Sequence, residues 1–399
     1  MLMRLPLLAL LAAPLAQADQ LNINVTHELA LARPSETITV PWSQVNKVLP
    51  GAMIQHIAVK DGAGRVLPHQ VTNIAPLVKD PLKVGAAYGE LIFQYSFAPG
   101  EKKASFTVTK TETLAPVFAS QAFARYVPER LDDFAWENDK VAHRTYGTAL
   151  GAPAAPGVVK EVLASSGIDI WFKRVPYPIV DRWYNKGHDH YHVDQGEGMD
   201  MYNVGKSRGC GGTGVWDGAT LFASHNYARW KMLANGPVRA IFELSYDAWD
   251  AGGVQVTEVK RFTIDAGHYL DQIDSTFTFA GPEQLTVAVG LNKTPTDKGQ
   301  TPKLSLSRTG QSQIQWVEQT RNGEFGTAVI VPSASGFADD PLNHLVLARV
   351  RSGQALRYHA GAAWNRSGDI ADSAQWHAYV AAAAQRIASP LTITIAEAK

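Results

Sequence analysis

The densest group of chemically active side chains lies in residues 188–202, where histidines and acids are interspersed with glycines. If the start of this segment is extended, successive side chains alternate between faces, and its three histidines fall on one face with Asp194. Two histidines separated by one residue, with a carboxylate nearby, can chelate a divalent metal. The segment therefore predicts a site for one calcium, manganese or zinc ion. Its ligands would be His190, His192, Asp194 and Glu197.

The alternative interpretation of residues 188–202 is a polar surface loop whose histidines are merely solvated. The neighbouring residues favour a concave site, because Trp183 and Tyr184 come just before and the glycine-rich run 209–212 comes just after. Glycine lets a backbone approach a ligand closely. Within this run, Cys210 is expected to be a small buried residue and not a nucleophile.

A second group of charged and aromatic residues occupies residues 125–144. Arg130 and Arg144 are suited to gripping a substrate carboxylate with two parallel hydrogen bonds, and Trp136 offers a flat face to a sugar. Glu137 could act as an acid-base group or as an oxygen ligand of a metal. The alternative is a network of surface salt bridges.

A third group, residues 358–369, places an aromatic pair, Tyr358 and Trp364, around a polar turn, and it could close one side of a cleft. The chain contains no serine-histidine-aspartate elbow, phosphate-binding loop or dinucleotide fingerprint. The sequence therefore predicts no organic cofactor.

The elements that must position these groups are mostly strands. Short alternating runs separated by turn residues indicate a β-sandwich over residues 19–115, and regularly spaced strands without alternating helices indicate one large antiparallel sandwich over residues 116–399. The predicted strands include residues 36–40, 54–59, 104–108, 168–175, 238–246, 254–264, 270–279, 327–331, 345–350 and 391–395. Residues 147–157 read as a loop. One short C-terminal helix, residues 374–387, is predicted behind the cap Asp372-Ser373 in an otherwise all-β fold.

The first eighteen residues have the three parts of a secretory signal, with Arg4, an apolar run over residues 5–15, and a cleavage site after Ala18. We expect a periplasmic or secreted protein that begins at Asp19. Its single cysteine excludes an internal disulfide. No later run approaches the ~20 apolar residues of a membrane span, so no membrane insertion is expected.

The composition favours a carbohydrate partner. The 37 basic and 37 acidic residues cancel, which argues against nucleic acid as a partner. Ten tryptophans and thirteen tyrosines supply flat rings that stack on sugar faces. Nothing in the sequence indicates an obligate protein partner.

Several motifs resemble a family of exported bacterial proteins of unknown function. The resemblance rests on the run 127–139, on residues 167–171, on residues 191–198, and on the runs 209–212 and 361–364, and it covers most of the mature chain. It implies a galactose-mutarotase-like super-sandwich, a fold that binds sugars in other families. It also implies a setting among genes that degrade pectin-like and other uronic-acid polysaccharides. Fold-level analogy does not assign roles to residues.

The leading hypothesis is an enzyme that cleaves a uronic-acid-containing glycan by β-elimination. This reaction needs a base, an acid and a group that neutralises the uronate carboxylate. His190 or His192 could be the base, Tyr191 or Tyr184 the acid, and an arginine or a metal the neutralising group. The predicted catalytic residues are His190, His192, Tyr191, Glu197 and Glu137. The predicted substrate-binding residues are Arg130, Trp136, Arg144, Trp183, Tyr184 and Trp364.

Other functions remain open at this stage. A glycoside hydrolase would use two carboxylates on either side of the bond, drawn from Glu137, Asp139, Asp194, Glu197 and Asp200. A sugar epimerase would fit the same fold. A noncatalytic carbohydrate-binding protein would need only the aromatic residues.

Overall fold

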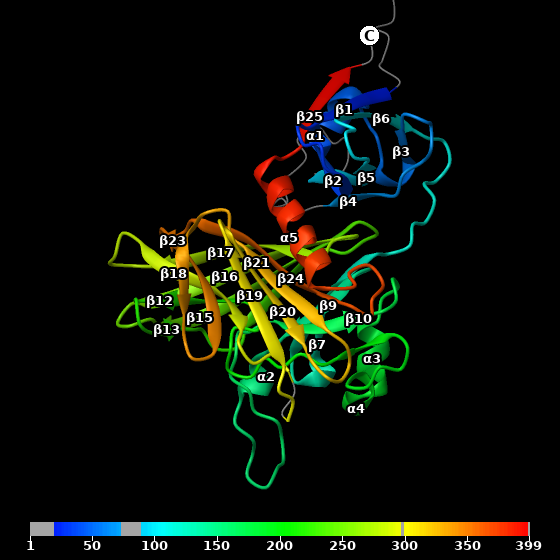
Figure 1. Ribbon diagram of the computed structural model, residues 1–399. Coiled ribbons are helices and arrows are strands. Elements are labelled where there is room, and N and C mark those ends of the chain that lie inside the picture. Colours follow the sequence, from blue (N-terminus) through cyan, green and yellow to red (C-terminus); the bar gives the residue numbers. More distant parts are fainter. Residues whose placement is uncertain (1–19, 73–88, 297–298, 398–399) are drawn as a thin grey trace, which may run out of the picture.

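The structure is a computed structural model that describes residues 20–72, 89–296 and 299–397. Strands dominate it, which confirms the predicted all-β fold class. Figure 1 shows a small unit that contains the first strands and a larger unit beside it. The predicted secretory signal, residues 1–18, lies outside the described residues.

The small unit is a sandwich of two sheets. One sheet has the order β25-β1-β6-β3 and the other the order β2-β5-β4. The strands are β1 (Gln20–Thr26), β2 (Arg33–Pro41), β3 (Ile57–Asp61), β4 (His69–Thr72), β5 (Glu90–Phe97), β6 (Lys103–Lys110) and β25 (Thr392–Glu397). Alternate apolar residues, such as Ile23, Phe93 and Phe106, fill the space between the sheets. Helix α1 (Trp42–Val48) and the 3-10 turn η1 (Ile54–His56) complete the unit.

The last strand of the chain belongs to this first unit. β25 pairs antiparallel with β1, with Leu21 opposite Glu397 and Thr26 opposite Thr392. The predicted strand at 391–395 therefore forms, but it joins a sheet made from the other end of the chain. A division of the chain at residue 116 does not separate the two units completely.

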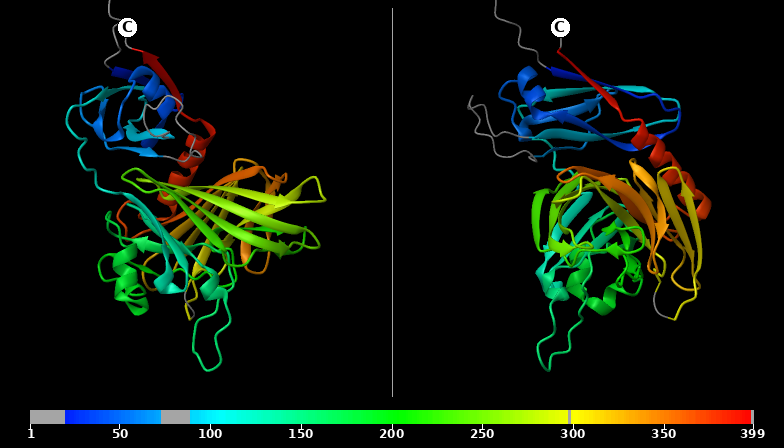
Figure 2. Two further views of the ribbon diagram at one scale, coloured as in Figure 1. Left: turned by 180° about the vertical axis from the view of Figure 1, so that it is seen from behind. Right: turned by 90° about the vertical axis from the view of Figure 1, so that its left-hand side faces the viewer.

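The larger unit contains three antiparallel sheets (Figure 2). The predicted strands 238–246, 254–264 and 270–279 form, whereas residues 355–364, part of which was expected to be a polar turn, also form a long strand. The eight-stranded sheet has the order β14-β15-β16-β17-β24-β21-β20-β19. Its strands are β14 (Arg229–Ala234), β15 (Arg239–Asp250), β16 (Gln255–Asp265), β17 (Leu270–Phe279), β19 (Lys303–Thr309), β20 (Ser312–Glu318), β21 (Phe325–Ile330) and β24 (Ala355–Trp364).

Two five-stranded sheets complete this unit. One has the order β13-β12-β18-β23-β22, and its strands are β12 (Cys210–Trp216), β13 (Leu221–Phe222), β18 (Leu285–Asn292), β22 (Ala334–Asp339) and β23 (Asn343–Val350). The other, called here the β7–β11 sheet, has the order β11-β10-β9-β8-β7. Its strands are β7 (Ala122–Val127), β8 (Asp133–Asn138), β9 (Val141–Thr145), β10 (Asp169–Lys173) and β11 (Gly198–Asp200). All three sheets contribute to one large apolar core.

The predicted C-terminal helix is α5 (Ser373–Ala388). The side chain of Asp372 accepts a hydrogen bond of 2.9 Å from the backbone N–H of Gln375, as a capping residue should. Trp376, Val380 and Ala383 on α5 belong to an apolar cluster with residues of the eight-stranded sheet. Because β25 follows directly, α5 links the larger unit to the small one (Figure 1).

Short helices lie at the β7–β11 sheet. They are η2 (Pro128–Arg130), α2 (Thr148–Gly151), α3 (Val180–Lys186) and α4 (His188–Tyr191). The predicted loop at residues 147–157 thus begins with a turn of helix. Within the described residues, no helix is long and apolar enough to cross a membrane.

Candidate active site on the β7–β11 sheet

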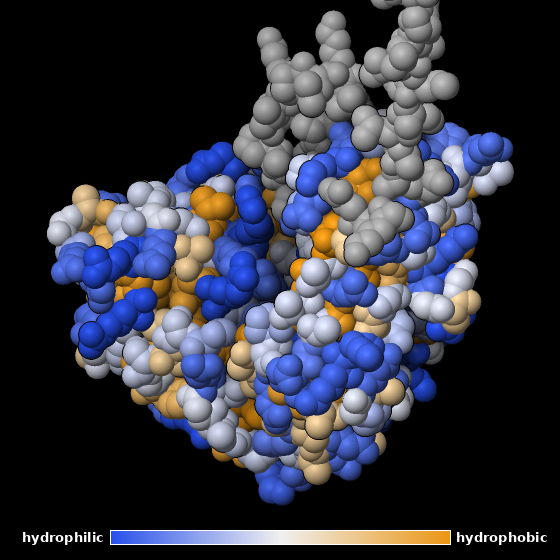
Figure 3. Space-filling model, turned by 90° about the horizontal axis from the view of Figure 1, so that it is seen from above, coloured by the Kyte–Doolittle hydropathy of each residue, from blue (hydrophilic) through white to orange (hydrophobic). Residues whose placement is uncertain are grey.

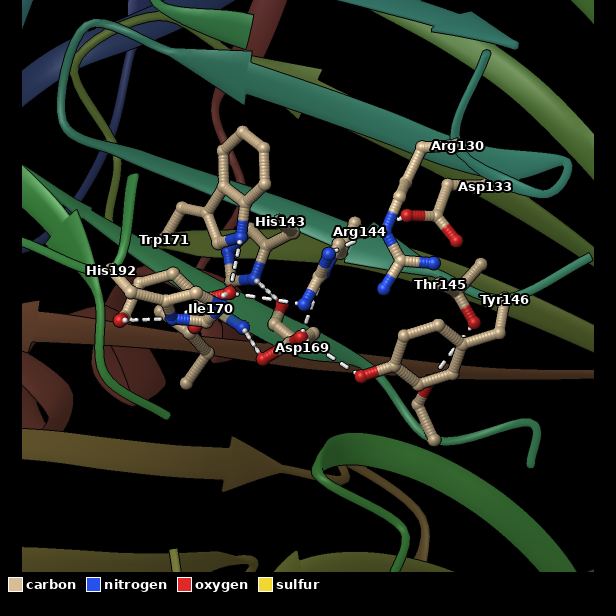
Figure 4. Close-up of polar contacts among 12 residues, drawn as sticks. Arg130, Asp133, His143, Arg144, Thr145, Tyr146, Asp169, Ile170, Trp171 and His192 are labelled. Atoms are coloured by element: carbon tan, nitrogen blue, oxygen red, sulfur yellow. Dashed lines mark hydrogen bonds and ion pairs between the residues drawn. The ribbon is translucent and has the colours of Figure 1, made fainter. Parts of the chain in front are cut away.

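The centre of the site is the buried guanidinium of Arg144, which meets three carboxylates (Figure 4). Its Nε lies 2.8 Å from Asp169, one terminal nitrogen lies 3.0 Å from Asp200, and the other lies 3.5 Å from Asp133. The hydroxyl of Tyr146 also donates to Asp169, at 2.8 Å. We call Arg144 and its three aspartates the Arg144 cluster.

The strand register explains why these side chains meet. Arg144 on β9 lies directly opposite Asp169 on β10, and Trp171 lies opposite Asp200 on β11. Side chains two residues apart share a face of a strand, so Asp169 and Trp171 point the same way. The cluster therefore forms on the face of the β7–β11 sheet opposite the large apolar core.

Burial and charge determine the protonation of the Arg144 cluster. The carboxylates around Arg144 raise its pKa well above its ordinary value against the opposing effect of burial, so it stays charged. Burial raises the pKa of Asp133 to about 6, although Arg144 and Arg130 oppose this. The Arg144 guanidinium also lies 5.4 Å from the ring centre of Trp171 and 5.7 Å from those of Tyr146 and Tyr191.

Helix α3 covers the cluster and is fastened by two glutamates. Glu137 lies 2.7 Å from the Nζ of Lys173 and accepts hydrogen bonds from the backbone N–H groups of Ile179 and Val180 at the start of α3. Glu197 accepts from the Nε of Arg182 at 2.8 Å and from Tyr177 at 2.9 Å. Both predicted acid-base residues are thus engaged in holding the helix.

Helix α4 and its C-cap residue place His188, Tyr191 and His192 at the edge of the cluster. The Nδ1 of His192 lies 3.1 Å from the backbone oxygen of Asp200, which can only accept, so Nδ1 carries the proton and Nε2 the lone pair. That Nε2 lies 3.2 Å from the Nε2 of His188. Burial lowers the pKa of His192, with His188 and Arg144 acting in the same direction. The imidazole is therefore neutral at pH 7 and able to accept a proton.

Tyr191 and Arg130 complete this edge. The buried hydroxyl of Tyr191 has no hydrogen-bond partner of good geometry, although Arg130 lies near enough to act on its pKa. Burial raises that pKa, and the charges of Arg144 and Arg130 partly offset the rise. The side chains of His188, His192 and Arg130 are 56%, 36% and 15% exposed, so a substrate could reach them from solvent.

Residues 25–393 match a family of unknown function, DUF4861. The chain belongs to the DUF4861 family. An uncharacterised protein P7 from Formosa agariphila is 30% identical over 390 residues, which cover 94% of this chain and 93% of that protein. The family resemblance expected from the sequence motifs is thereby confirmed.

Two solved structures from Enterococcus faecalis share a distant likeness. One is a protein of glycosyl hydrolase family 38, with a TM-score of 0.49 and 10% identity, and the other is an α-mannosidase, with a TM-score of 0.48 and 9% identity. Each match covers 96% of this chain but only 49% and 46% of those structures. The DUF4861 chain thus spans about half the length of either one.

The predicted metal ligands of this DUF4861 chain do not meet. Residues 188–191 form a helix, not an extended strand, so the three histidines do not share one face. Asp194 pairs with Arg174 at 2.9 Å and accepts from the backbone N–H of Gly196. Within residues 20–72, 89–296 and 299–397, no group of three histidines, cysteines or acids is placed to hold a metal. His190, His192, Asp194 and Glu197 therefore do not fit the ion as a set.

The predicted sugar-stacking residues are mostly buried. Trp136, Trp183 and Trp364 are each 1% exposed, and Tyr184 is 8% exposed. Trp136 donates to Asp271 at 2.8 Å, and Trp364 donates to the backbone oxygen of Asn322 at 2.7 Å. These rings belong to the apolar interior, where their N–H groups have partners, so they offer no face to a sugar.

The glycine-rich run around Cys210 also packs inside the protein. A Cβ at Gly211 would lie 2.5 Å from Ala360 on β24, so the close approach serves a neighbouring strand and not a ligand. Cys210 is buried as predicted, and burial raises its pKa to about 12. Such a thiol does not act as a nucleophile at neutral pH.

Sequence reasoning did not assign roles to Asp133, Asp169 and Tyr146. The available signal was an acid within an apolar strand, as in residues 168–172, because a buried carboxylate needs a partner. The partner itself could not be identified from the sequence, since Arg144 lies on another strand.

The buried side chain of Asp271, which accepts a hydrogen bond from Trp136, should make the stability of the protein depend on pH. Burial raises the pKa of Asp271 to about 7, while the unfolded carboxyl titrates near ~4. Between these values the folded protein keeps a proton that the unfolded chain has released. The contribution of Asp271 to the free energy of unfolding should therefore fall by about 1.4 kcal/mol per unit as the pH rises from ~5 to ~7. Urea unfolding at three pH values measures this.

The substitution Asp271→Asn should remove that slope, because an amide keeps the acceptor for Trp136 without titrating. His143 and Asp133, whose pKa values also differ between the folded and unfolded chain, are present in both proteins, so the difference between the two slopes reports on Asp271. Equal slopes in the two proteins would contradict the assignment.

Proposed function

We propose that this protein is a carbohydrate-active enzyme that cleaves a uronic-acid-containing glycan by β-elimination. The observation that carries the proposal is the accessible edge of the Arg144 cluster, where a neutral imidazole, a buried phenol and a guanidinium lie together. These three groups correspond to the base, the acid and the carboxylate-neutralising cation that the reaction needs.

In this mechanism, Arg130 pairs with the uronate carboxylate and makes the proton on C5 more acidic. The Nε2 of His192 removes that proton, the C4–O bond breaks, and a double bond forms between C4 and C5. The hydroxyl of Tyr191 donates its proton to the departing oxygen. Arg144 touches none of the reacting atoms, and it positions Tyr191 and the strands around it.

Hydrolysis is the second candidate, because Asp133 has the raised pKa of a general acid. It is less favoured, since the carboxylates that the sequence predicts for hydrolysis are held by cations. Glu137 is held by Lys173, Asp139 by Lys140, Glu197 by Arg182, Asp194 by Arg174 and Asp200 by Arg144.

The test is a substrate screen on pectic, alginate and glucuronan oligosaccharides. Elimination creates an unsaturated uronate that absorbs near the ultraviolet edge, whereas hydrolysis releases reducing sugar without that absorbance. New absorbance supports the proposal. Reducing ends without absorbance would replace it with hydrolysis, and binding without any product would replace it with a noncatalytic role.

The ion pair between Glu161 and Arg130 leads to a further prediction about substrate affinity. Glu161 pairs with Arg130 at 2.6 Å and is half-exposed, so it occupies the cation that the substrate carboxylate would use. A partly exposed ion pair contributes about 0.2–1 kcal/mol. The substitution Glu161→Gln should therefore lower KM by about 1.5- to 5-fold and leave kcat unchanged.

The matched control is Asp247→Asn, which breaks an exposed pair with Arg229 on the eight-stranded sheet. Steady-state kinetics on the same oligosaccharide compares the two variants. A higher KM in Glu161→Gln would mean that Glu161 helps to bind the substrate and does not compete with it.

A further inference from the structure

A separate cavity lies where the small sandwich meets the larger unit. It has a volume of about 410 Å³, and its walls come from β2, from the outer face of the eight-stranded sheet, and from α5 and β25. Figure 3 shows a hollow with hydrophilic walls on the face seen from above. Ligand sites are often found between domains and have volumes of roughly 300–1,000 Å³.

Positive charge predominates in the walls. Four arginines, Arg33, Arg239, Arg357 and Arg386, outnumber the three acidic residues that pair with them, Glu36, Asp265 and Asp274. Arginine side chains match carboxylates and other oxyanions through parallel N–H donors. The cavity is therefore suited to a negatively charged ligand.

The acids hold the arginines in place without neutralising all of them. Glu36 is shared, because it lies 3.2 Å from Arg33 and 3.4 Å from Arg386. Asp265 pairs with Arg239 and also accepts from Thr37 at 2.9 Å. Guanidinium groups fixed in this way lose less conformational freedom when they bind a ligand.

Two buried nitrogen atoms in the walls have no hydrogen-bond partner. They are the Nε of Arg33, a residue that is 1% exposed, and the Nδ1 of His359 on β24. Buried polar atoms normally have partners, so these two nitrogens are hydrogen-bonding capacity that the protein itself leaves unused. Burial lowers the pKa of His359 to about 4, so its imidazole is neutral.

The rest of the lining suits a sugar ring. Thr39, Thr263 and Gln272 offer polar groups that could bond to hydroxyls, and Tyr379 with Leu391 offers apolar surface. We propose that this cavity binds an anionic saccharide of one or two units, separate from the Arg144 cluster and independent of catalysis there. Its anionic group is a carboxylate or a sulfate.

The experiment is titration calorimetry on the full chain carrying His192→Gln. This substitution keeps turnover at the Arg144 cluster from contributing to the measured heat. The probes are galacturonate, digalacturonate, galactose 6-sulfate and neutral galactose. We expect binding of at least one anionic probe and none of galactose, with weaker binding at high salt. Comparison of the uronates with the sulfate identifies the anionic group.

Substitutions in the cavity wall test whether the probe binds there. Arg386→Gln and His359→Gln should each lower the affinity for the anionic probe by about 10-fold or more, as expected for lost hydrogen bonds to a charged ligand. Arg261→Gln is the matched control, since Arg261 lies on the outer face of the same sheet, pairs with Glu243 and does not line the cavity. Thermal unfolding confirms that each variant is folded.

No binding of any anionic probe at millimolar concentration would overturn the proposal. Equal affinity in Arg386→Gln, His359→Gln and Arg261→Gln would also overturn it. Because catalysis is not measured, neither result bears on the proposed elimination reaction.

Discussion

Replacing His192 with glutamine is expected to lower the rate of product formation by about 100- to 10,000-fold, the usual contribution of a general base. Glutamine can keep the hydrogen bond to the backbone oxygen of Asp200 but cannot accept the C5 proton. The initial rate at which the ultraviolet absorbance of the unsaturated product rises measures this loss. Circular dichroism checks that the fold is unchanged.

His190→Gln is the informative comparison. An extended segment would place His190 and His192 on the same face, whereas the helical backbone directs them to different faces. We expect a rate within about tenfold of the unaltered protein, less than a general base contributes. If His190→Gln lost as much activity as His192→Gln, the assignment of the base would be wrong.

The pH profile provides a second check on His192. Burial lowers its pKa, so the neutral form persists below the ordinary range of histidine. The rate governed by this base should be constant around pH 7 and fall only as the pH drops through the lowered pKa. A rate that already declines between pH 8 and 7 would contradict this role.

Replacing Arg144 with methionine is expected to lower the free energy of unfolding by about 3–5 kcal/mol, because removing one partner of a buried ion pair leaves uncompensated charge. Here Asp133, Asp169 and Asp200 would each lose the guanidinium that compensates their charge. Urea unfolding at pH 7 measures the change.

Two controls separate charge from geometry. Arg144→Lys keeps the charge but not the planar fork that reaches Asp169 and Asp200, so an intermediate loss is expected. Arg229→Gln removes an exposed pair with Asp247 and should cost no more than about 1 kcal/mol. Equal stability of Arg144→Met and the unaltered protein would show that the cluster is not held by its ion pairs.

Much of the fold could be predicted because the signals are local. The alternation of buried and exposed residues along β16 identifies a strand with one face in the core. Helix α5 begins at its predicted cap because the Asp372 side chain reaches a backbone N–H only three residues away. Both signals depend on residues that are close in the chain.

The candidate site was predicted only in part. Of the residues predicted for the site, Arg130, Arg144, Tyr191 and His192 do lie together. It predicted the wrong backbone for residues 188–191, since polar side chains without an apolar period do not distinguish a short helix from an extended segment. It also could not tell buried tryptophans from exposed ones.

By itself, the sequence determined the strands with clear alternation, such as β15, β16 and β17, the capped helix and the types of side chain available for chemistry, since these depend on local period and residue chemistry. Only the tertiary structure decided which of them meet. Arg144 reaches its three aspartates across neighbouring strands, β25 returns to β1, and the arginines of the junction cavity come from distant segments. The physical reason is that strand register and packing join residues far apart in the chain, and no local pattern encodes those contacts.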